Sequence, residues 1–415
     1  MISIFSEHNH PRIQYVFKHI FNIVLAVDFE IVTNKDEFQK KSNPKISYTE
    51  FPLQDEIHIK KNGTISKIEN TENWEMYDDV IQCFLLLSRY EEYLPFVADK
   101  HQRFPFSQSK QFKYIDVEKP FVDDFAYELK TQILKKFPQY IFPEKKPKIV
   151  MTVDVDRVYK VLSLSKKDAV LYLLKRFLKF DWNGFFHYFK VNYYYGIEDL
   201  QPKIRDEYDT YNYILSHFPQ TIFFVQVGKK GKFDNNYAPE NESFKRKIET
   251  LSWKQTIGLH PSYQSNEKIE ILHQEKQILE KIIGKNIEIS RQHYLKLKFP
   301  ETYRNLLQCG ITKDYTLGFA DQIGFRAGTS HSFFWYDLHN ETETNLELIP
   351  FQIMDVTLKN YLQFSLEKSI EKVQEIYHQI EKVNGTLVCI FHNQNLTNKN
   401  QWKNWNQVFE SLARF

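Results

Sequence analysis

The C-terminal two-thirds of the chain alternates apolar, strand-like runs with helix-like segments, and polar clusters stand at or just past the ends of several runs. Residues 148–153 lead to Asp154 and Asp156, and residues 386–391 lead to His392. Three more clusters occupy 258–264, 290–293 and 324–328. Alternating strands and helices are typical of βα units, which build a parallel sheet or barrel. Such folds gather active-site residues at successive strand ends, so the pattern predicts an α/β hydrolase.

Composition is that of a globular protein with room for two domains. The chain has 415 residues, of which 42% are hydrophobic and 26% charged. Its 35 Phe and 25 Tyr can build a sizeable core and offer faces for stacking on sugars. The net charge is +2, with Lys and Arg spread along the chain, which argues against a nucleic-acid surface as the main function.

The cysteines and the N-terminal residues indicate the cellular compartment in which the protein is expected. Cys83, Cys309 and Cys389 lie far apart in apolar contexts and form no CxxC pair, which favours buried thiols in a reducing compartment. The first residues lack a basic segment followed by an apolar one, and no stretch resembles a transmembrane span. We therefore expect a cytoplasmic protein.

Three regions are predicted along the chain. Residues 1–115 form an N-terminal α+β domain, in which Asn62-Gly63 predicts a hairpin between strands at 50–59 and 64–68. Residues 116–147 form a connector with a helix and a proline-bounded linker. Residues 148–415 form the βα domain, with a helical insertion at about 160–215.

The segment 165–195 within this insertion has two interpretations. It begins with a basic, amphipathic stretch at 166–179 and continues with aromatic clusters. Such a segment is typical of a peripheral membrane contact or a face for an acidic partner. The alternative, which we favour from the sequence, is that both helices pack their apolar sides on the barrel.

Asp154 and Asp156 point to the same side of their predicted strand, because successive side chains alternate. Two such carboxylates are costly to ionise together unless a cation or an arginine lies between them. This favours one as a metal ligand and the other as a base. The alternative is an ion pair with Arg157 that caps a turn.

Five later residues complete the candidate site. His260 follows a short strand and is a candidate metal ligand that Ser262 could brace, and His293 is placed to face the same cavity. Arg291 can orient an aspartate, or form a surface ion pair instead. His392 emerges from an apolar strand as a candidate general acid, or is a buried structural histidine. Arg326 lies on a glycine-rich loop that wraps a ligand or only turns the chain.

These motifs together resemble the polysaccharide deacetylases of the NodB-homology type, carbohydrate esterase family four, over residues 148–400. The resemblance implies a distorted (β/α) barrel with seven strands, a divalent metal, most simply Zn²⁺, and removal of an N-acetyl group from an amino sugar. It assigns Asp154 as catalytic base, Asp156 and His260 as metal ligands, Arg291 as the residue that orients Asp154, and His392 as general acid. The predicted substrate contacts are Tyr263, with its backbone N–H, Arg326 and Asn393.

One position departs from the family pattern. The second motif usually carries two histidines four residues apart, but here the partner position of His260 is Gln264. Zn²⁺ sites normally use three protein ligands, so His293 or the amide oxygen of Gln264 is predicted to supply the third. A site without metal is the alternative, because some relatives of this fold hydrolyse other amide bonds without one.

The N-terminal region resembles an uncharacterised domain that is fused to such deacetylases in bacteria. The similarity rests on residues 87–92 and Arg103-Phe104, with 318–321 and 324–328 typical of the same subgroup. Three functions therefore remain open: an amino-sugar N-deacetylase acting on an envelope or capsule precursor, a metal-independent hydrolase of another C–N amide bond, and an inactive carbohydrate-binding protein. Gln264 favours the last, whereas a base, an acid and an orienting arginine together disfavour it.

Overall fold

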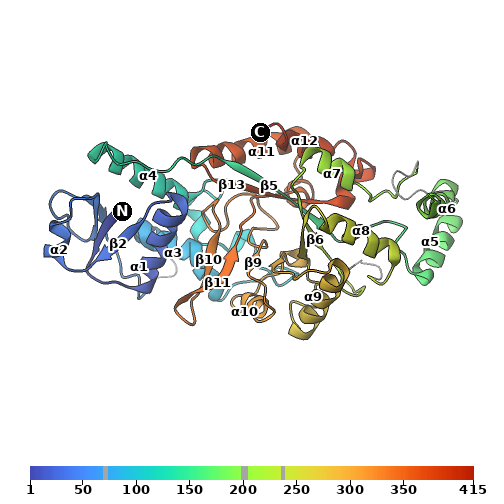
Figure 1. Ribbon diagram of the computed structural model, residues 1–415, viewed down its shortest axis with the longest axis horizontal. Coiled ribbons are helices and arrows are strands. Elements are labelled where there is room, and N and C mark those ends of the chain that lie inside the picture. Colours follow the sequence, from blue (N-terminus) through green and yellow to red (C-terminus); the bar gives the residue numbers. More distant parts are fainter. Residues whose placement is uncertain (69–72, 198–203, 235–238) are drawn as a thin grey trace.

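The computed structural model describes residues 1–68, 73–197, 204–234 and 239–415. Two sheets organise them: a small N-terminal sheet and a large sheet that occupies the middle of an elongated molecule (Figure 1). A helical pair projects at the end of the molecule farthest from the N-terminal sheet (Figure 1). The prediction of an α/β fold with a separate N-terminal unit is confirmed.

The N-terminal sheet has the strand order β2-β1-β3-β4, and every neighbouring pair is parallel. All five side chains of β1 are buried, which makes it the centre of this unit. Asp78 caps helix α3 by accepting the N–H of Ile81 with its carboxylate, and the helix packs eight buried residues toward the core. The elements are β1 (Ile2–Ser6), α1 (Pro11–Phe17), β2 (Phe29–Val32), α2 (Lys35–Gln39), β3 (Lys45–Thr49), β4 (Ile57–Lys60) and α3 (Asp79–Ser88).

The hairpin predicted at Asn62-Gly63 is wrong. Gly63 does turn the chain with a φ of +111°, but residues 64–68 form no strand. The Asn62 N–H instead donates to the Asp78 carboxylate at 2.8 Å, which ties the turn to the start of α3. Ile65 and Ile68 are buried in the core rather than paired with β4. Tertiary packing has therefore overridden the local turn signal.

The connector holds the two units together. Helix α4 (Phe121–Lys136) is the helix predicted within the connector, and it buries Asp123 completely. The Asp123 carboxylate accepts hydrogen bonds from the hydroxyls of Thr329 and Ser330, at 2.5 and 2.6 Å, and from the Ser330 N–H. Because these bonds lie in the interior, they fix the connector on the large domain.

Within the described residues the large sheet has nine strands, in the order β10-β11-β9-β8-β7-β6-β5-β13-β12. The seven from β9 to β12 are successively parallel, β11 adds parallel to β9, and β10 is antiparallel to β11. The sheet curls as an open half-barrel with β10 and β12 as edges. Its strands are β5 (Lys148–Val155), β6 (Ile222–Val225), β7 (Thr256–Leu259), β8 (Ile289–Ser290), β9 (Lys313–Asp314), β10 (Phe333–Asp337), β11 (Thr342–Leu348), β12 (Ile353–Met354) and β13 (Thr386–His392).

Amphipathic helices accompany these strands. Helix α11 shows the pattern: Val373, Ile376, Tyr377 and Ile380 are buried at helical spacing, and charged side chains fill the rest of its surface. The helices are α7 (Tyr211–His217), α8 (Glu242–Ser252), α9 (Ile269–Ile283), α10 (Glu301–Gln308), α11 (Leu366–Lys382) and α12 (Asn406–Leu412). All three cysteines are buried and free.

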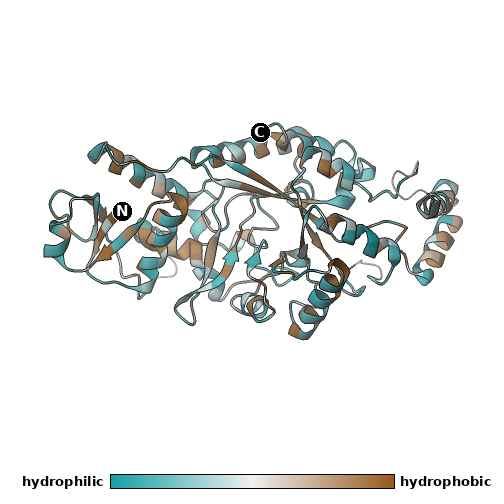
Figure 2. Cartoon of the chain, in the orientation of Figure 1, coloured by the Kyte–Doolittle hydropathy of each residue, from teal (hydrophilic) through white to brown (hydrophobic). Residues whose placement is uncertain are grey.

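The inserted helices α5 (Lys166–Leu178) and α6 (Trp182–Ile197) do not pack as the sequence led us to expect. Only Ala169 in α5 and Val191 in α6 are buried among their described side chains. Many of their large apolar side chains are therefore exposed. Hydrophobic residues recur along the projecting pair (Figure 2). Residues 198–203 of the predicted insertion lie outside the described residues. No helix among the described residues has the length and apolar character needed to cross a membrane.

Candidate active site and metal centre

Parallel pairing brings the ends of four neighbouring strands, β13, β5, β6 and β7, to one edge of the large sheet. In the β5–β13 register Asp154 lies opposite His392. The next pairs in order join Val155 to Val225 and Val225 to Leu259. The residues that follow these aligned strand ends therefore lie side by side along the sheet edge. The polar side chains predicted from the sequence converge there.

Asp154 is held by Arg291, which follows β8. Arg291 Nη1 donates to Asp154 Oδ1 at 2.8 Å, and Nε donates to the carbonyl of Tyr315 at 3.0 Å. Both side chains of the ion pair are buried. The guanidinium carbon of Arg291 lies 4.4 Å from the centre of the Phe224 ring. That ring fits because residue 258 is glycine: a Cβ there would lie 2.5 Å from it.

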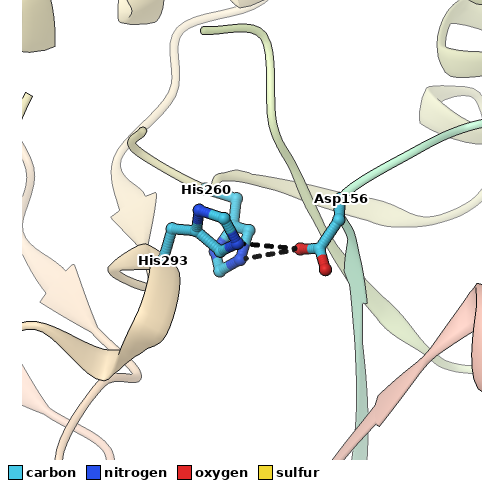
Figure 3. Close-up of side chains that lie close together, drawn as sticks. All are labelled: Asp156, His260 and His293. Atoms are coloured by element: carbon cyan, nitrogen blue, oxygen red, sulfur yellow. Dashed lines mark ion pairs between the residues drawn. The ribbon is translucent and has the colours of Figure 1, made fainter. Parts of the chain in front are cut away.

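Asp156, His260 and His293 form a compact cluster beside this pair (Figure 3). Asp156 Oδ1 lies 3.3 Å from His260 Nε2 and 3.6 Å from His293 Nε2. All three potential ligand atoms lie within 4.8 Å of one another. His293 reaches the cluster from a loop in which Tyr294 and Leu295 have φ values of +60° and +53°, an uncommon conformation for such residues.

The Nδ1 atoms of both imidazole rings, which lie on the side away from Asp156, contact oxygen atoms of other residues. His260 Nδ1 donates to the carbonyl oxygen of Arg291 at 2.6 Å, and His293 Nδ1 lies 2.8 Å from Asp234 Oδ1. The amide of Gln226 donates to the same Asp234 oxygen at 2.9 Å. Hydrogen bonds of this kind fix the tautomer and leave Nε2 with a free lone pair, as in metal-binding histidines.

The cluster fits a divalent metal ion. His260 Nε2 and Asp156 Oδ1 are buried without a hydrogen-bond partner, which is costly unless another group satisfies them. Tetrahedral Zn²⁺ bonds of about 2.0–2.2 Å place ligand atoms about 3.4 Å apart, close to the two distances from Asp156. Two imidazoles and one carboxylate also form a donor set that Zn²⁺ prefers.

His392 pairs with a carboxylate that the sequence analysis missed. His392 Nδ1 lies 2.8 Å from Oδ1 of Asp355, which follows β12. The second oxygen, Oδ2, accepts the backbone N–H of His392 at 3.0 Å and the amide of Asn395 at 2.9 Å. Burial would lower the pKa of His392, but the charge and hydrogen bond of Asp355 outweigh it and raise the pKa to about 10. The raised pKa favours the protonated form of the ring, which is the form that a proton donor needs.

A cavity of about 300 Å³ joins these groups. Asp154, Asp156, His260, His293 and His392 all line it. Aromatic side chains from three short helical segments complete its walls: Tyr294, Tyr361 and Trp402. Such a volume, with a few converging polar groups among apolar and aromatic ones, is that of a small-ligand site.

The N-terminal domain also reaches the cavity, through Arg103. Arg103 Nη1 donates to the carbonyl of Tyr294 at 2.8 Å, Nη2 donates to the hydroxyl of Tyr361 at 3.0 Å, and Nε donates to Asp99 at 2.8 Å. Arg103 therefore holds two aromatic walls of the cavity in place. The loop that carries it gives the N-terminal domain a direct part in shaping the site.

The structure separates the two alternatives for the third ligand. Gln264 is exposed and lines a different cavity with Phe233 and Tyr263, whereas His293 lies in the cluster. Tyr263 lines that second cavity too, and its N–H donates to Asp234 Oδ1 at 2.9 Å. The expected role of this N–H in holding an oxyanion is therefore not supported, because the group already has a partner.

Two further predicted substrate contacts are also not supported. Arg326 is buried, with Nε donating to Glu92 at 3.0 Å and Nη1 to the Gly318 carbonyl at 2.7 Å. Asn393 is buried as well, and its amide donates to the carbonyls of Arg157 and Tyr208 at 2.9 and 3.1 Å. Neither lines the cavity, and both hold neighbouring segments together.

Two of the missed residues, Asp355 and Gln226, carried a usable signal. Each follows a short apolar run, just as Asp154 and His260 do, and the same strand-end rule would have found them. Asp234 carried none, and Arg103 was named only for the resemblance of the N-terminal region, without a role in the site. They stand on loops whose positions depend on contacts between segments far apart in the chain.

Comparisons with known proteins add limited information. The model of a family of unknown function (DUF7033) matches residues 2–138. The match is consistent with the expected uncharacterised domain at the N-terminus, but it covers too little of the chain to assign the whole protein to a family. No curated protein matches the sequence.

Solved structures with some likeness include three hydrolases. A putative polysaccharide deacetylase from Mycobacterium smegmatis is 13% identical, covering 66% of this chain and 86% of that one, with a TM-score of 0.40. PuuE allantoinase is 10% identical, covering 65% and 83%, with a TM-score of 0.40. The polysaccharide deacetylase Bc1974 from Bacillus cereus is 11% identical, covering 65% and 85%, with a TM-score of 0.30. Likeness at this level identifies neither activity nor substrate, so function must be inferred from the site.

Proposed function

We propose that this protein is a metal-dependent hydrolase that removes an acyl group, most simply acetyl, from the nitrogen of an amino sugar. One observation carries the proposal: a single cavity is lined by a carboxylate paired with arginine, a three-residue metal cluster and a histidine paired with aspartate. A binding site for sugars has no need of this combination. Hydrolysis of an amide needs a base, an electrophile and an acid.

Asp156, His260 and His293 would hold the metal ion. When bound, such an ion polarises the acyl carbonyl and lowers the pKa of a water molecule from about 15.7 to about 7. His260 Nε2 lies 3.9 Å from Asp154 Oδ2, so the proposed base stands next to the ligand cluster. This proximity supports the assignment of Asp154 as a base that acts beside the metal site.

Asp154 accepts the proton of the attacking water, and Arg291 keeps its carboxylate oriented toward the cavity. The water oxygen bonds to the acyl carbon, and the bond between that carbon and the nitrogen breaks. His392, which Asp355 holds protonated, donates a proton to the leaving nitrogen. The products are a carboxylic acid and a free amine.

The choice of an amino sugar is supported by the cavity itself. Its volume of about 300 Å³ suits one small ring rather than a folded peptide. Tyr294, Tyr361 and Trp402 offer faces on which a sugar ring can stack. The alternative of an inactive protein rested on Gln264, which stands where the family motif has its second histidine. His293 lies in the cluster with Asp156 and His260, so a third potential ligand is available and this support is lost.

An assay for acyl release tests the proposal. We expect the zinc-loaded protein to release acetate from an N-acetylhexosamine, free or linked to a nucleoside diphosphate. Asp154→Asn should lower kcat by about 10²–10⁴-fold, because the base is removed. Asp36→Asn, the same change at an exposed position on α2, should leave kcat unchanged. Equal activity in Asp154→Asn, or no release by the wild-type protein from any amide tested, would reject the proposal.

A further inference from the structure

The helical pair α5–α6 carries an unusual concentration of exposed apolar side chains. Among the described residues, 22 large hydrophobic side chains are exposed, and ten of them lie between positions 170 and 193. Phe180, at the turn between the helices, is 77% exposed, and Leu178 is 67% exposed. Scattered apolar side chains are normal on a protein surface, but a contiguous group marks an interaction site.

The exposed residues form a stripe on each helix. On α5 they are Val170, Leu171, Leu174, Phe177 and Leu178, which recur at the three- and four-residue spacing of one helical face. On α6 they are Trp182, Phe186, Phe189 and Tyr193, at spacings of four, three and four. Each helix therefore presents one continuous apolar face.

The α5–α6 pair is a folded helical hairpin and not an unfolded tail. Ser165 caps α5 by accepting the N–H of Asp168 at 3.1 Å, and Asp181 accepts the N–H of Gly184 at 2.9 Å at the start of α6. The rings of Tyr172 and Tyr188 lie 6.2 Å apart, and those of Phe177 and Trp182 lie 5.5 Å apart. The apolar faces are thus held outward by a defined fold.

Charge identifies the kind of surface that the pair fits. Residues 165–195 contain six basic side chains and two acidic ones. Both acids are already neutralised: Asp168 pairs with Lys230 at 2.8 Å and Asp181 with Arg176 at 2.7 Å. The five lysines of the pair, Lys166, Lys167, Lys175, Lys179 and Lys190, are all exposed. An apolar stripe of Leu, Phe and Trp flanked by lysines is typical of a helix that lies in the headgroup region of an anionic bilayer.

Helix length excludes a spanning arrangement. α5 has 13 residues and α6 has 16, so at about 1.5 Å per residue they extend roughly 20 and 24 Å. A bilayer core is about 30 Å thick. We propose that the α5–α6 pair is a peripheral membrane anchor that inserts its two apolar faces into the surface of a bilayer rich in anionic lipids.

The position of the anchor in the chain connects it to the candidate site. It is inserted in the connection from β5 to β6, which starts at the strand end that carries Asp154 and Asp156. The membrane proposal itself rests on α5 and α6 and does not depend on the proposed hydrolase activity.

Sedimentation with lipid vesicles tests the anchor with the full-length protein. We expect binding to vesicles of phosphatidylcholine with 30% phosphatidylglycerol, at least about tenfold weaker binding to pure phosphatidylcholine, and weakening by added salt. Leu174→Glu with Phe186→Glu should lower the affinity at least about tenfold, as should Lys175→Glu with Lys179→Glu. Tryptophan fluorescence should shift to the blue on binding, and the shift should shrink in Trp182→Phe.

Matched controls change equivalent residues elsewhere. Ile141→Glu with Trp253→Glu alters two exposed apolar side chains outside the pair, and Lys135→Glu with Lys136→Glu alters two lysines on α4. Both controls should bind as the wild type does. The proposal is overturned if the wild type ignores anionic vesicles, or if the α5–α6 variants bind equally well. It is also overturned if these variants only convert an oligomer to a monomer, since the face would then join copies of the chain.

Discussion

Replacing His392 by glutamine is expected to lower kcat for amide hydrolysis by about 10²–10⁴-fold, the usual contribution of a general acid. Glutamine can still reach Asp355 but cannot deliver a proton to the leaving nitrogen. The imidazole is suited to that task because Asp355, 2.8 Å away, raises its pKa well above neutrality. Substrate binding should change less, since the acid acts on the bond being broken.

Steady-state kinetics on the zinc-loaded protein measures this effect, with circular dichroism as a check of folding. His378→Gln makes the same change on the exposed face of α11 and should leave kcat unchanged. A His392→Gln variant that keeps its fold and its wild-type kcat would remove His392 from the mechanism. A variant that loses only affinity would assign it to substrate binding.

Replacing Glu92 by glutamine should destabilise the protein by about 3–5 kcal/mol, the usual cost of breaking a buried ion pair. Glu92 Oε1 accepts Arg89 Nε at 2.8 Å, and Oε2 accepts Arg326 Nη2 at 2.5 Å. Burial would raise the pKa of Glu92, but the charges of Arg326 and Arg89 outweigh it and hold the pKa below its ordinary range. Without the carboxylate, two buried guanidinium groups lose their shared partner.

Urea denaturation followed by fluorescence gives the free energy of unfolding for this comparison. Glu371→Gln removes a carboxylate from an exposed pair with Lys368 on α11 and should have no measurable effect. Because Glu92 and Arg326 lie on the two domains, the loss should also reduce their coupling. An unfolding free energy equal to that of the wild type would show that Arg326 is satisfied by the Gly318 carbonyl and not by this ion pair.

Much of the large domain could be predicted from the sequence, because its strands and the polar residues after them are marked by short stretches of neighbouring residues. A buried parallel strand needs an apolar run, and the polar residue after it must lie at the sheet edge, so Asp154, His260 and His392 were found without knowing the strand order. The register that aligns Asp154 with His392 could not be predicted, because it depends on contacts between β5 and β13, more than 200 residues apart.

The unpredicted features depend on long-range packing. The glycines around Arg326 left open whether its loop wraps a ligand or only turns the chain. The guanidinium instead binds Glu92, which lies 234 residues away in sequence. For α5 and α6, an amphipathic pattern is the same whether the apolar face meets a sheet or remains outside. Only the tertiary structure, in which the pair projects from the molecule, separates the two interpretations (Figure 1).

The central claim is that Asp156, His260 and His293 form a metal site, and elemental analysis of the purified chain tests it most directly. After loading with Zn²⁺ and removal of excess metal, we expect about one ion per wild-type chain. His260→Ala and His293→Ala should each lose it, whereas Gln264→Ala, at the exposed position, should retain it. Full retention of Zn²⁺ in His293→Ala, or no ion in the wild-type protein under any loading condition, would contradict the account.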